Sequence, residues 1–181
     1  METSTATTTK WGIDASHSEV LFKVKHLMIS TVTGSFKEFG ADAELEGDDL
    51  TNASVSFWAN TASIFTNDEK RDGHLRSGDF FDSEKFPKLT FTSTRVEGSG
   101  SQWKVTGDLA IKGVTKPVTL DVEWSGMAKD PWGNTKAGLQ LSGRIDRKQW
   151  GLNWNAALET GGLLVSDEVR IVCEVQLAAQ G

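Results

Sequence analysis

The chain of 181 residues is poor in cysteine, and it has no long apolar stretch. Cys173 is the single cysteine, so an intrachain disulfide and a cysteine-based metal cluster are both excluded. No run approaches the roughly eighteen apolar residues of a transmembrane helix, so we expect no stable membrane insertion. The opening METSTATTTK lacks the apolar core of a signal peptide. We therefore expect residues 1–10 to be a disordered polar tail. We expect a cytoplasmic location for the chain as written, or a periplasmic or secreted one if a signal was removed.

Basic charge and tyrosine are also scarce. A formal net charge of -6 argues against a general affinity for nucleic acid or for anionic membrane surfaces. The aromatic residues are seven Trp and nine Phe with no Tyr, so they are strongly apolar as a set. Such a set suits a roomy hydrophobic interior, and it equally suits an ordinary packed core.

What the chain does contain is a period-2 alternation of apolar and polar residues. In SEVLFKVKH, Val20, Phe22 and Val24 fall on one face, and the same pattern recurs along the chain to EVRIVCEVQL near its end. Strands with one apolar face are typical of antiparallel sheets. Gly- and Asn/Asp-containing connections such as EGDDLTNA and DPWGN separate them. The sequence predicts a single all-β domain over residues 11–178.

An antiparallel eight-stranded, lipocalin-like β-barrel accounts for these strands better than a sandwich does. Several strands reach roughly ten residues, beyond the usual five to six. Glycines inside the strands favour a strongly coiled sheet. Small residues that are expected to face inward, Ala59, Gly107 and Gly143, would either leave space inside or form corners of the barrel. A barrel of eight strands can hold one small ligand.

The stretch NDEKRDGHLRSGDFFDS, residues 67–83, gathers acids, arginines and a histidine. Thr66 and Glu69 fit a capping box, so we expect a short helical insertion between strands that Gly73 weakens or ends. We interpret Thr66, Arg71, Asp72 and His74 as a structural brace. In this interpretation Arg71 binds a carboxylate or carbonyl groups, and Asp72 accepts from the amides of residues 74–76.

Neither a metal site nor a catalytic site is predicted in this stretch. The three histidines, His17, His26 and His74, lack the H-x-x-x-H and H-E-x-x-H spacings of metal sites. Ser77 lies near His74 in sequence, but no G-x-S-x-G elbow accompanies the pair. The uncharged neighbours Phe80 and Phe81 are the residues in this stretch that we expect to meet a ligand.

Several phrases are similar to the YceI-like family of lipocalin-type barrels. They are WGIDASHSEVLFKVKHLMISTVTGSFKEF, SIFTNDEKRDGHLRSGDFFDSEKFPKLTF, GDLAIKGVTKPVTL, RIDRKQWGLNW and SDEVRIV. The resemblance runs from Trp11 to about Leu177. It implies a bacterial protein with an extended barrel and a helical insertion. It also implies non-catalytic binding, carriage or sequestration of a polyisoprenoid or an isoprenoid quinone, with no cofactor required.

We expect the inward apolar face and the barrel mouth to contact this lipid. The predicted ligand-binding residues are Phe22, Val24, His26, Phe36, Phe57, Phe80, Phe81, Phe91, Leu109, Leu120, Trp124, Leu139, Ile171 and Val175. His26 can hydrogen-bond a ligand's head group or a nearby backbone carbonyl.

Two alternatives stay open. One is an enzyme that acts on an isoprenoid or quinone with His26 or His74 as acid or base. The other is an interaction protein with a filled core, in which an exposed cluster of Trp58, Trp132 and Trp150 forms a homodimer interface.

Overall fold

The structure is a computed structural model, and it describes residues 7–156 and 164–180. In chain order the strands are β1 (Thr8–Ile13), β2 (Glu19–His26), β3 (Ser30–Phe36), β4 (Phe39–Glu46), β5 (Ser54–Asn60), β6 (Ile64–Phe65), β7 (Lys88–Ser99), β8 (Gln102–Ile111), β9 (Val114–Lys129), β10 (Thr135–Asp146) and β11 (Val165–Gln180). One α-helix, α1 (Glu69–Arg76), lies between β6 and β7. Short 3₁₀ turns occur at Ala15–His17, Leu50–Asn52, Thr61–Ser63 and Arg147–Trp150.

Eight of these strands form a closed ring. Its order is β1-β4-β5-β7-β8-β9-β10-β11, and pairing of β1 with β11 closes it. Every pairing is antiparallel. The predicted all-β class, the eight-stranded antiparallel barrel and the short helical insertion are therefore confirmed.

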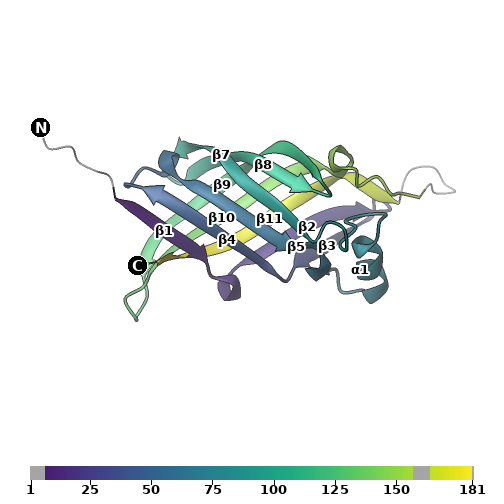
Figure 1. The fold of residues 1–181 in the computed structure, drawn as a ribbon, viewed down its shortest axis with the longest axis horizontal. Coiled ribbons are helices and arrows are strands. Elements are labelled where there is room, and N and C mark those ends of the chain that lie inside the picture. The colour runs from purple at the N-terminus through teal and green to yellow at the C-terminus, as the bar shows by residue number, and fades with distance from the viewer. Residues whose placement is uncertain (1–6, 157–163, 181) are drawn as a thin grey trace, which may run out of the picture.

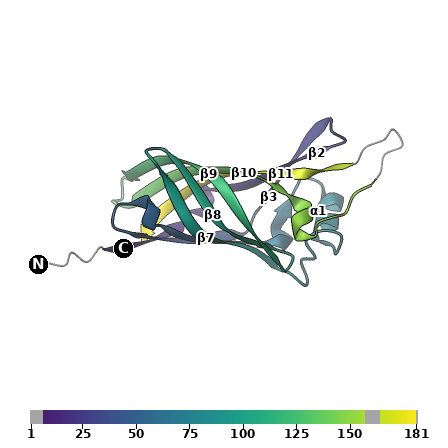
Figure 2. The same ribbon diagram turned by 90° about the horizontal axis from the view of Figure 1, so that it is seen from above.

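The long strand β11 joins two partners along one edge. Its last residues, from Leu177 to Gln180, pair with β1, whereas residues 165–174 pair with β2. β2 and β3 therefore extend the sheet beyond the ring, and β6 pairs with the end of β3. Figures 1 and 2 show α1 beside this extension, at the end of the barrel opposite both chain termini.

Close packing between neighbouring strands explains some of the strand glycines. A Cβ atom on Gly34 would lie 2.1 Å from the Phe22 ring, and one on Gly107 would lie 2.5 Å from the Phe91 ring. Each ring lies over the glycine of the paired strand, because only a residue without a side chain leaves room there. The space predicted beside Gly107 is thus occupied by Phe91. The space predicted beside Gly143 is occupied by Leu120 in the same way, with 2.5 Å to the nearest carbon.

The first strand begins inside the segment predicted as a tail. β1 starts at Thr8, and Thr8, Thr9 and Lys10 pair with the end of β4, so residues 8–10 belong to the barrel. Backbone pairing needs no apolar side chain, which is why the polar composition misled the prediction. Residues 1–6 lie outside the described part of the chain. At the other end β11 continues to Gln180, past the predicted boundary at residue 178.

Candidate functional site

The interior of the barrel is hollow. A cavity of about 730 Å³ is lined from Trp11 and Leu45, near the termini, to Phe80 and Trp154, near α1. This volume lies in the usual range of small-molecule sites, roughly 300–1,000 Å³. β9 and β11 have 16 residues each, and a strand rises roughly 3.3 Å per residue. The barrel is consequently elongated (Figure 1), so its cavity suits a long ligand better than a compact one.

The predicted ligand-binding residues all lie on the wall of this cavity. They are Phe22, Val24, His26, Phe36, Phe57, Phe80, Phe81, Phe91, Leu109, Leu120, Trp124, Leu139, Ile171 and Val175. Most come from strands whose alternation directs every second side chain inward. Phe80 and Phe81 instead follow α1. There, Phe81 packs edge-on against Phe36 with ring centroids 5.9 Å apart.

Several wall residues were not among those predicted, including Trp103, Cys173, Arg147 and Trp154. Trp103 and Cys173 belong to alternating strands, so the period-2 pattern contains the signal that finds them. Burial raises the pKa of the Cys173 thiol to about 11, because the thiolate is disfavoured in apolar surroundings. The strand pattern does not reach Trp154, which follows the 3₁₀ turn at Arg147–Trp150.

Ionisable wall residues gather at the α1 end of the cavity. They are Lys25, His26, Asp68, Lys70, Arg71, His74 and Arg147. Among the other described residues of the wall, Glu44 and Cys173 carry ionisable groups. The cavity thus combines a long apolar interior with one polar end, which matches an amphiphile that has a long tail and a small polar head.

The helix α1 begins at a different cap from the one predicted. Asp68, not Thr66, is the N-cap, and its carboxylate accepts a hydrogen bond from the Arg71 amide at 3.1 Å. This bond lowers the pKa of Asp68. An aspartate next to the first helical residue is as good a cap as threonine, so the capping-box reading was two residues too early. The helix also continues through Gly73 to Arg76, where Ser77 ends it.

Thr66 instead takes part in the brace. The buried Asp72 carboxylate accepts from the Thr66 amide at 2.8 Å and from its hydroxyl at 2.5 Å. Arg71 donates to the Thr66 hydroxyl at 2.7 Å and to the Thr66 carbonyl at 2.5 Å. The expected acceptance by Asp72 from the amides of residues 74–76 is wrong, because the side chain points back across the start of the helix to Thr66, which follows the strand β6. Of the two partners expected for Arg71, a carboxylate or carbonyl groups, the structure shows a single carbonyl, that of Thr66, together with the Thr66 hydroxyl.

The division between a charged brace and an apolar ligand wall is less strict than predicted. Thr66, Arg71 and His74 line the cavity as well as holding the helix. The His74 ring meets Asp79 at 2.9 Å and packs edge-on against Trp154, with ring centroids 4.5 Å apart. Phe80 lies beside both rings.

Ser77 and His74 are not arranged as a nucleophile and its general base. Its hydroxyl donates to the backbone carbonyl of His74 at 2.5 Å, while the imidazole of His74 faces Asp79. Within residues 7–156 and 164–180 no group of three or more His, Cys, Asp or Glu side chains is placed to hold a metal ion.

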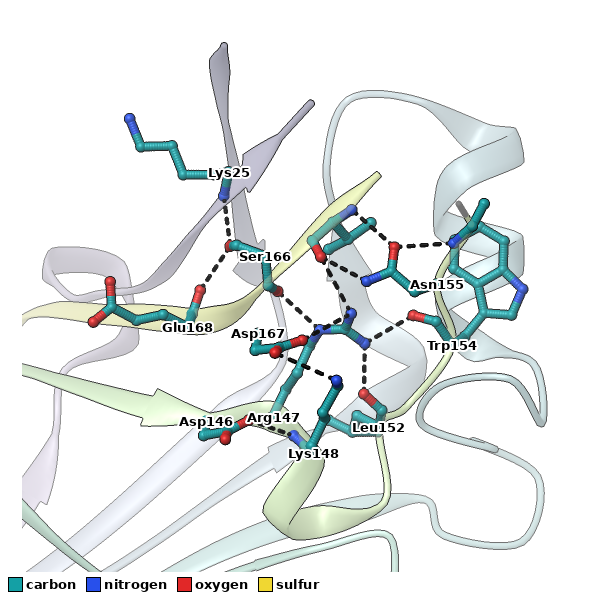
Figure 3. Close-up of polar contacts among 12 residues, drawn as sticks. Lys25, Asp146, Arg147, Lys148, Leu152, Trp154, Asn155, Ser166, Asp167 and Glu168 are labelled. Carbon is teal, nitrogen blue, oxygen red and sulfur yellow. Dashed lines mark hydrogen bonds and ion pairs between the residues drawn. The ribbon is translucent and has the colours of Figure 1, made fainter. Parts of the chain in front are cut away.

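A second brace, which the sequence did not reveal, centres on Arg147. This residue is 3% exposed. Its guanidinium donates to the carbonyls of Ser166 (2.9 Å), Leu152 (2.5 Å) and Trp154 (2.9 Å), as Figure 3 shows. Burial lowers its pKa, because the charged form loses hydration. Arg147 is one of three successive charged residues, so nothing in the charge pattern distinguishes it from its neighbours.

The three tryptophans considered for an outer interface do not form one cluster. Trp150 is 1% exposed, and its ring nitrogen donates to the Leu109 carbonyl at 2.8 Å. Trp58 is partly buried beneath the Lys88 ammonium, 4.4 Å from the ring centroid. Trp132 is 83% exposed. The three side chains therefore do not form the exposed tryptophan cluster that was considered as a homodimer interface.

A closed antiparallel barrel with a hollow, apolar interior and one polar end defines a lipocalin-type ligand-binding protein. The comparisons with known proteins agree. Residues 11–177 match the YceI-like domain, so the chain belongs to the YceI-like family. In the described residues, no helix has the length and apolar character needed to cross a membrane.

Relatives with similar sequences span nearly the whole chain. A UPF0312 protein of Staphylococcus aureus (strain USA300) is 40% identical over 173 residues, which cover 94% of this chain and 98% of the relative. A UPF0312 protein of Staphylococcus epidermidis is 42% identical with the same coverage.

Solved structures show the same fold. The YCEI protein of Campylobacter jejuni has a TM-score of 0.75 at 34% identity, covering 93% of this chain and 96% of that one. BcnA of Burkholderia cenocepacia has a TM-score of 0.77 at 25% identity, covering 91% and 98%. A polyisoprenoid binding domain from Saccharophagus degradans, at 17% identity and a TM-score of 0.66, covers 94% and 98% and shows likeness of fold alone.

Proposed function

We propose that this protein binds a long isoprenoid-type lipid, a polyisoprenoid or an isoprenoid quinone, inside the barrel and carries or sequesters it without catalysis. The observation that carries the proposal is the apolar cavity of about 730 Å³ with its polar end near α1. Family membership supports it. The tail would lie between the strands, and the head group would lie near Arg71 and His74.

The energetics favour an apolar chain in such a cavity. An isoprenoid offers methyl, methylene and alkene groups, and each buried CH₂ contributes up to about 0.8 kcal/mol. Twenty carbons could supply roughly 10 kcal/mol after the cost of immobilisation. No catalytic residue is needed for that gain. Phe22 and Ile171 pair across β2 and β11 and present only hydrocarbon to the cavity.

The test is the lipid content of the purified protein. The protein is isolated without detergent and extracted with organic solvent, and the extract is analysed by mass spectrometry. We expect about one long-chain isoprenoid lipid per chain. Protein that is empty as isolated and takes up no added geranylgeraniol would overturn the proposal.

A pair of adjacent substitutions on β11 provides a matched control. Val175 lines the cavity, whereas its neighbour Glu174 is exposed on the outer face. Val175→Trp should fill part of the cavity and lower the bound lipid several-fold, while Glu174→Trp should leave it unchanged. Circular dichroism verifies that both variants fold.

One observation keeps an enzymatic alternative testable. His74 lines the cavity and has a carboxylate partner in Asp79, as an acid or base would need. If the protein is an enzyme, incubation with geranylgeraniol or a quinone should yield a product of altered mass, and His74→Gln should abolish it. For a carrier, the lipid is recovered unchanged.

A further inference from the structure

Three large apolar side chains are exposed at the tip of the β2–β3 hairpin. Leu27 is 36% exposed, Met28 is 69% exposed and Ile29 is 83% exposed. The Ile29 amide donates to the His26 carbonyl at 3.1 Å, which closes a tight turn with Leu27 and Met28 at its centre. Contiguous apolar side chains at an exposed tip mark an interaction site more often than single exposed ones do.

The backbone of this turn is unfavourable for the residues that occupy it. Leu27 has φ 58° and Met28 has φ 57°, a left-handed conformation that favours Asn and Gly. The turn between β8 and β9 places Lys112 and Gly113 at φ 51° and 77°, so there a glycine occupies the second position. The β2–β3 turn keeps two bulky apolar residues where the backbone disfavours them, which points to a role for the side chains.

The tip is continuous with the mouth of the cavity. Lys25 and His26, immediately before the turn, line the cavity. The Leu27 amide donates to the Leu164 carbonyl at 2.8 Å, and Leu164 also lines the cavity. Figures 1 and 2 show the β2–β3 hairpin at the same end of the barrel as α1, where the polar wall residues gather.

The charge of the hairpin is opposite to that of the whole chain. The hairpin, Glu19–Phe36, contains Lys23 and Lys25 near its tip and one acid, Glu19, at its far end, in a protein of net charge -6. Acidic groups do occur elsewhere at this end, on α1 and at the start of β11, so the basic character belongs to the hairpin itself. A basic hairpin with an apolar tip is complementary to an anionic lipid surface.

We propose that the tip formed by Leu27, Met28 and Ile29 inserts into the interface of an anionic lipid bilayer and so docks the cavity mouth on the membrane. The inference rests on the proposed lipid binding, because an apolar ligand that leaves through water would expose its whole chain. Three side chains are too few for a protein interface, which needs roughly 1,000 Å² of buried surface. They are enough for a peripheral, reversible contact with lipid.

Vesicle flotation tests the proposal directly. The full chain is mixed with vesicles of equal parts phosphatidylglycerol and phosphatidylcholine, and bound protein is measured after centrifugation. We expect the wild type to float with these vesicles and to bind pure phosphatidylcholine vesicles several-fold less. The triple variant Leu27→Asn/Met28→Gly/Ile29→Thr should bind at least tenfold less, while its turn residues suit the backbone and keep it folded.

The matched control is Trp132→Ser at the opposite end of the barrel. Trp132 is 83% exposed, as Ile29 is. If vesicle binding were nonspecific adsorption through exposed apolar side chains, both variants would bind less. We expect the control to bind vesicles like the wild type. Undiminished binding by the triple variant, or equal binding to both kinds of vesicle, would overturn the proposal.

Two further readouts separate this inference from its alternatives. Light scattering that shows a wild-type dimer and a monomeric triple variant, without vesicle binding, would assign the tip to a protein interface and overturn the proposal. The extracted lipid content tests the proposed function on its own. Lipid-loaded protein that ignores vesicles defeats only the docking proposal, whereas vesicle binding by a protein that never holds lipid defeats only the carrier.

Discussion

The amide and the hydroxyl of Thr66 both donate to one carboxylate oxygen of Asp72, at 2.8 and 2.5 Å. Thr66 follows the strand β6, and Asp72 lies in the middle of α1, so this contact fastens the helix to the sheet. Both residues are buried. Residues 67–83, whose charged side chains suggest an active site in the sequence, thus serve largely to hold α1 in place at one end of the cavity.

Asp72→Asn should destabilise the protein by about 2 kcal/mol, because the Thr66 donors lose a charged acceptor. Urea denaturation followed by tryptophan fluorescence measures the change. Asp79→Asn is the control, since the Asp79 side chain is 55% exposed and its loss should cost well under about 1 kcal/mol. Equal effects of the two substitutions would contradict the brace.

Arg147→Met should cost about 3 kcal/mol. The substitution leaves the carbonyls of Leu152, Trp154 and Ser166 without their shared donor in a buried place. Arg144→Met is a matched control in the preceding strand, because the Arg144 side chain is 69% exposed and, in the part of the chain that the structure describes, its ion pair is with Glu168. Thermal unfolding should separate the two variants by several degrees. If Arg147→Met leaves the free energy of unfolding unchanged, the guanidinium is not needed to hold the backbone at Leu152, Trp154 and Ser166.

Gly107→Ala should destabilise the barrel by about 1–3 kcal/mol, because the new methyl group would lie 2.5 Å from the Phe91 ring and 2.5 Å from the Thr92 carbonyl. Gly138→Ala is the comparison, since its nearest neighbour would be the Ser125 Cβ at an ordinary 3.7 Å. Chemical denaturation of both variants gives the difference. If Gly138→Ala proves as costly, close packing of the ring is not the reason for glycine at 107.

Cys173 should make stability fall at high pH. Its pKa is about 11 in the folded protein against 9.0 for the ordinary thiol, so between these values the unfolded chain binds fewer protons than the folded one. The free energy of unfolding therefore decreases as the pH rises, by about 2 kcal/mol between pH 8 and pH 10.5. Cys173→Val lacks this titration, so the comparison with the wild type isolates it. Parallel curves for the two proteins would refute the burial of the thiol.

Leu27→Asn/Met28→Gly should raise the free energy of unfolding by about 1–2 kcal/mol, because both residues occupy left-handed backbone that Asn and Gly adopt more readily. The melting temperature reports this gain independently of any vesicle. A stabilised variant that loses vesicle binding would show that the tip trades stability for docking. No gain in stability would mean that the turn is not strained.

Much of the fold could be predicted from local pattern alone. The alternation in residues 18–26 and 168–177 orients Phe22, Val24, Ile171 and Val175 to one face, because side chains alternate along any strand. The start of the helix α1 could be located within two residues, because helix-capping residues are also a local pattern. The cap itself was misplaced, because Asp68 and Thr66 are both good caps and only the backbone path decides between them.

What the sequence determined, then, is the identity of the inward-facing residues and the class of fold, since both follow from periodicity and turn composition. Only the tertiary structure decided that the interior is hollow, because empty volume depends on how rings such as Phe91 fill the space beside Gly107. It also decided that Arg147 is buried and that Leu27, Met28 and Ile29 stand exposed beside the cavity mouth. These are relations between segments far apart in the chain, and no local pattern encodes them.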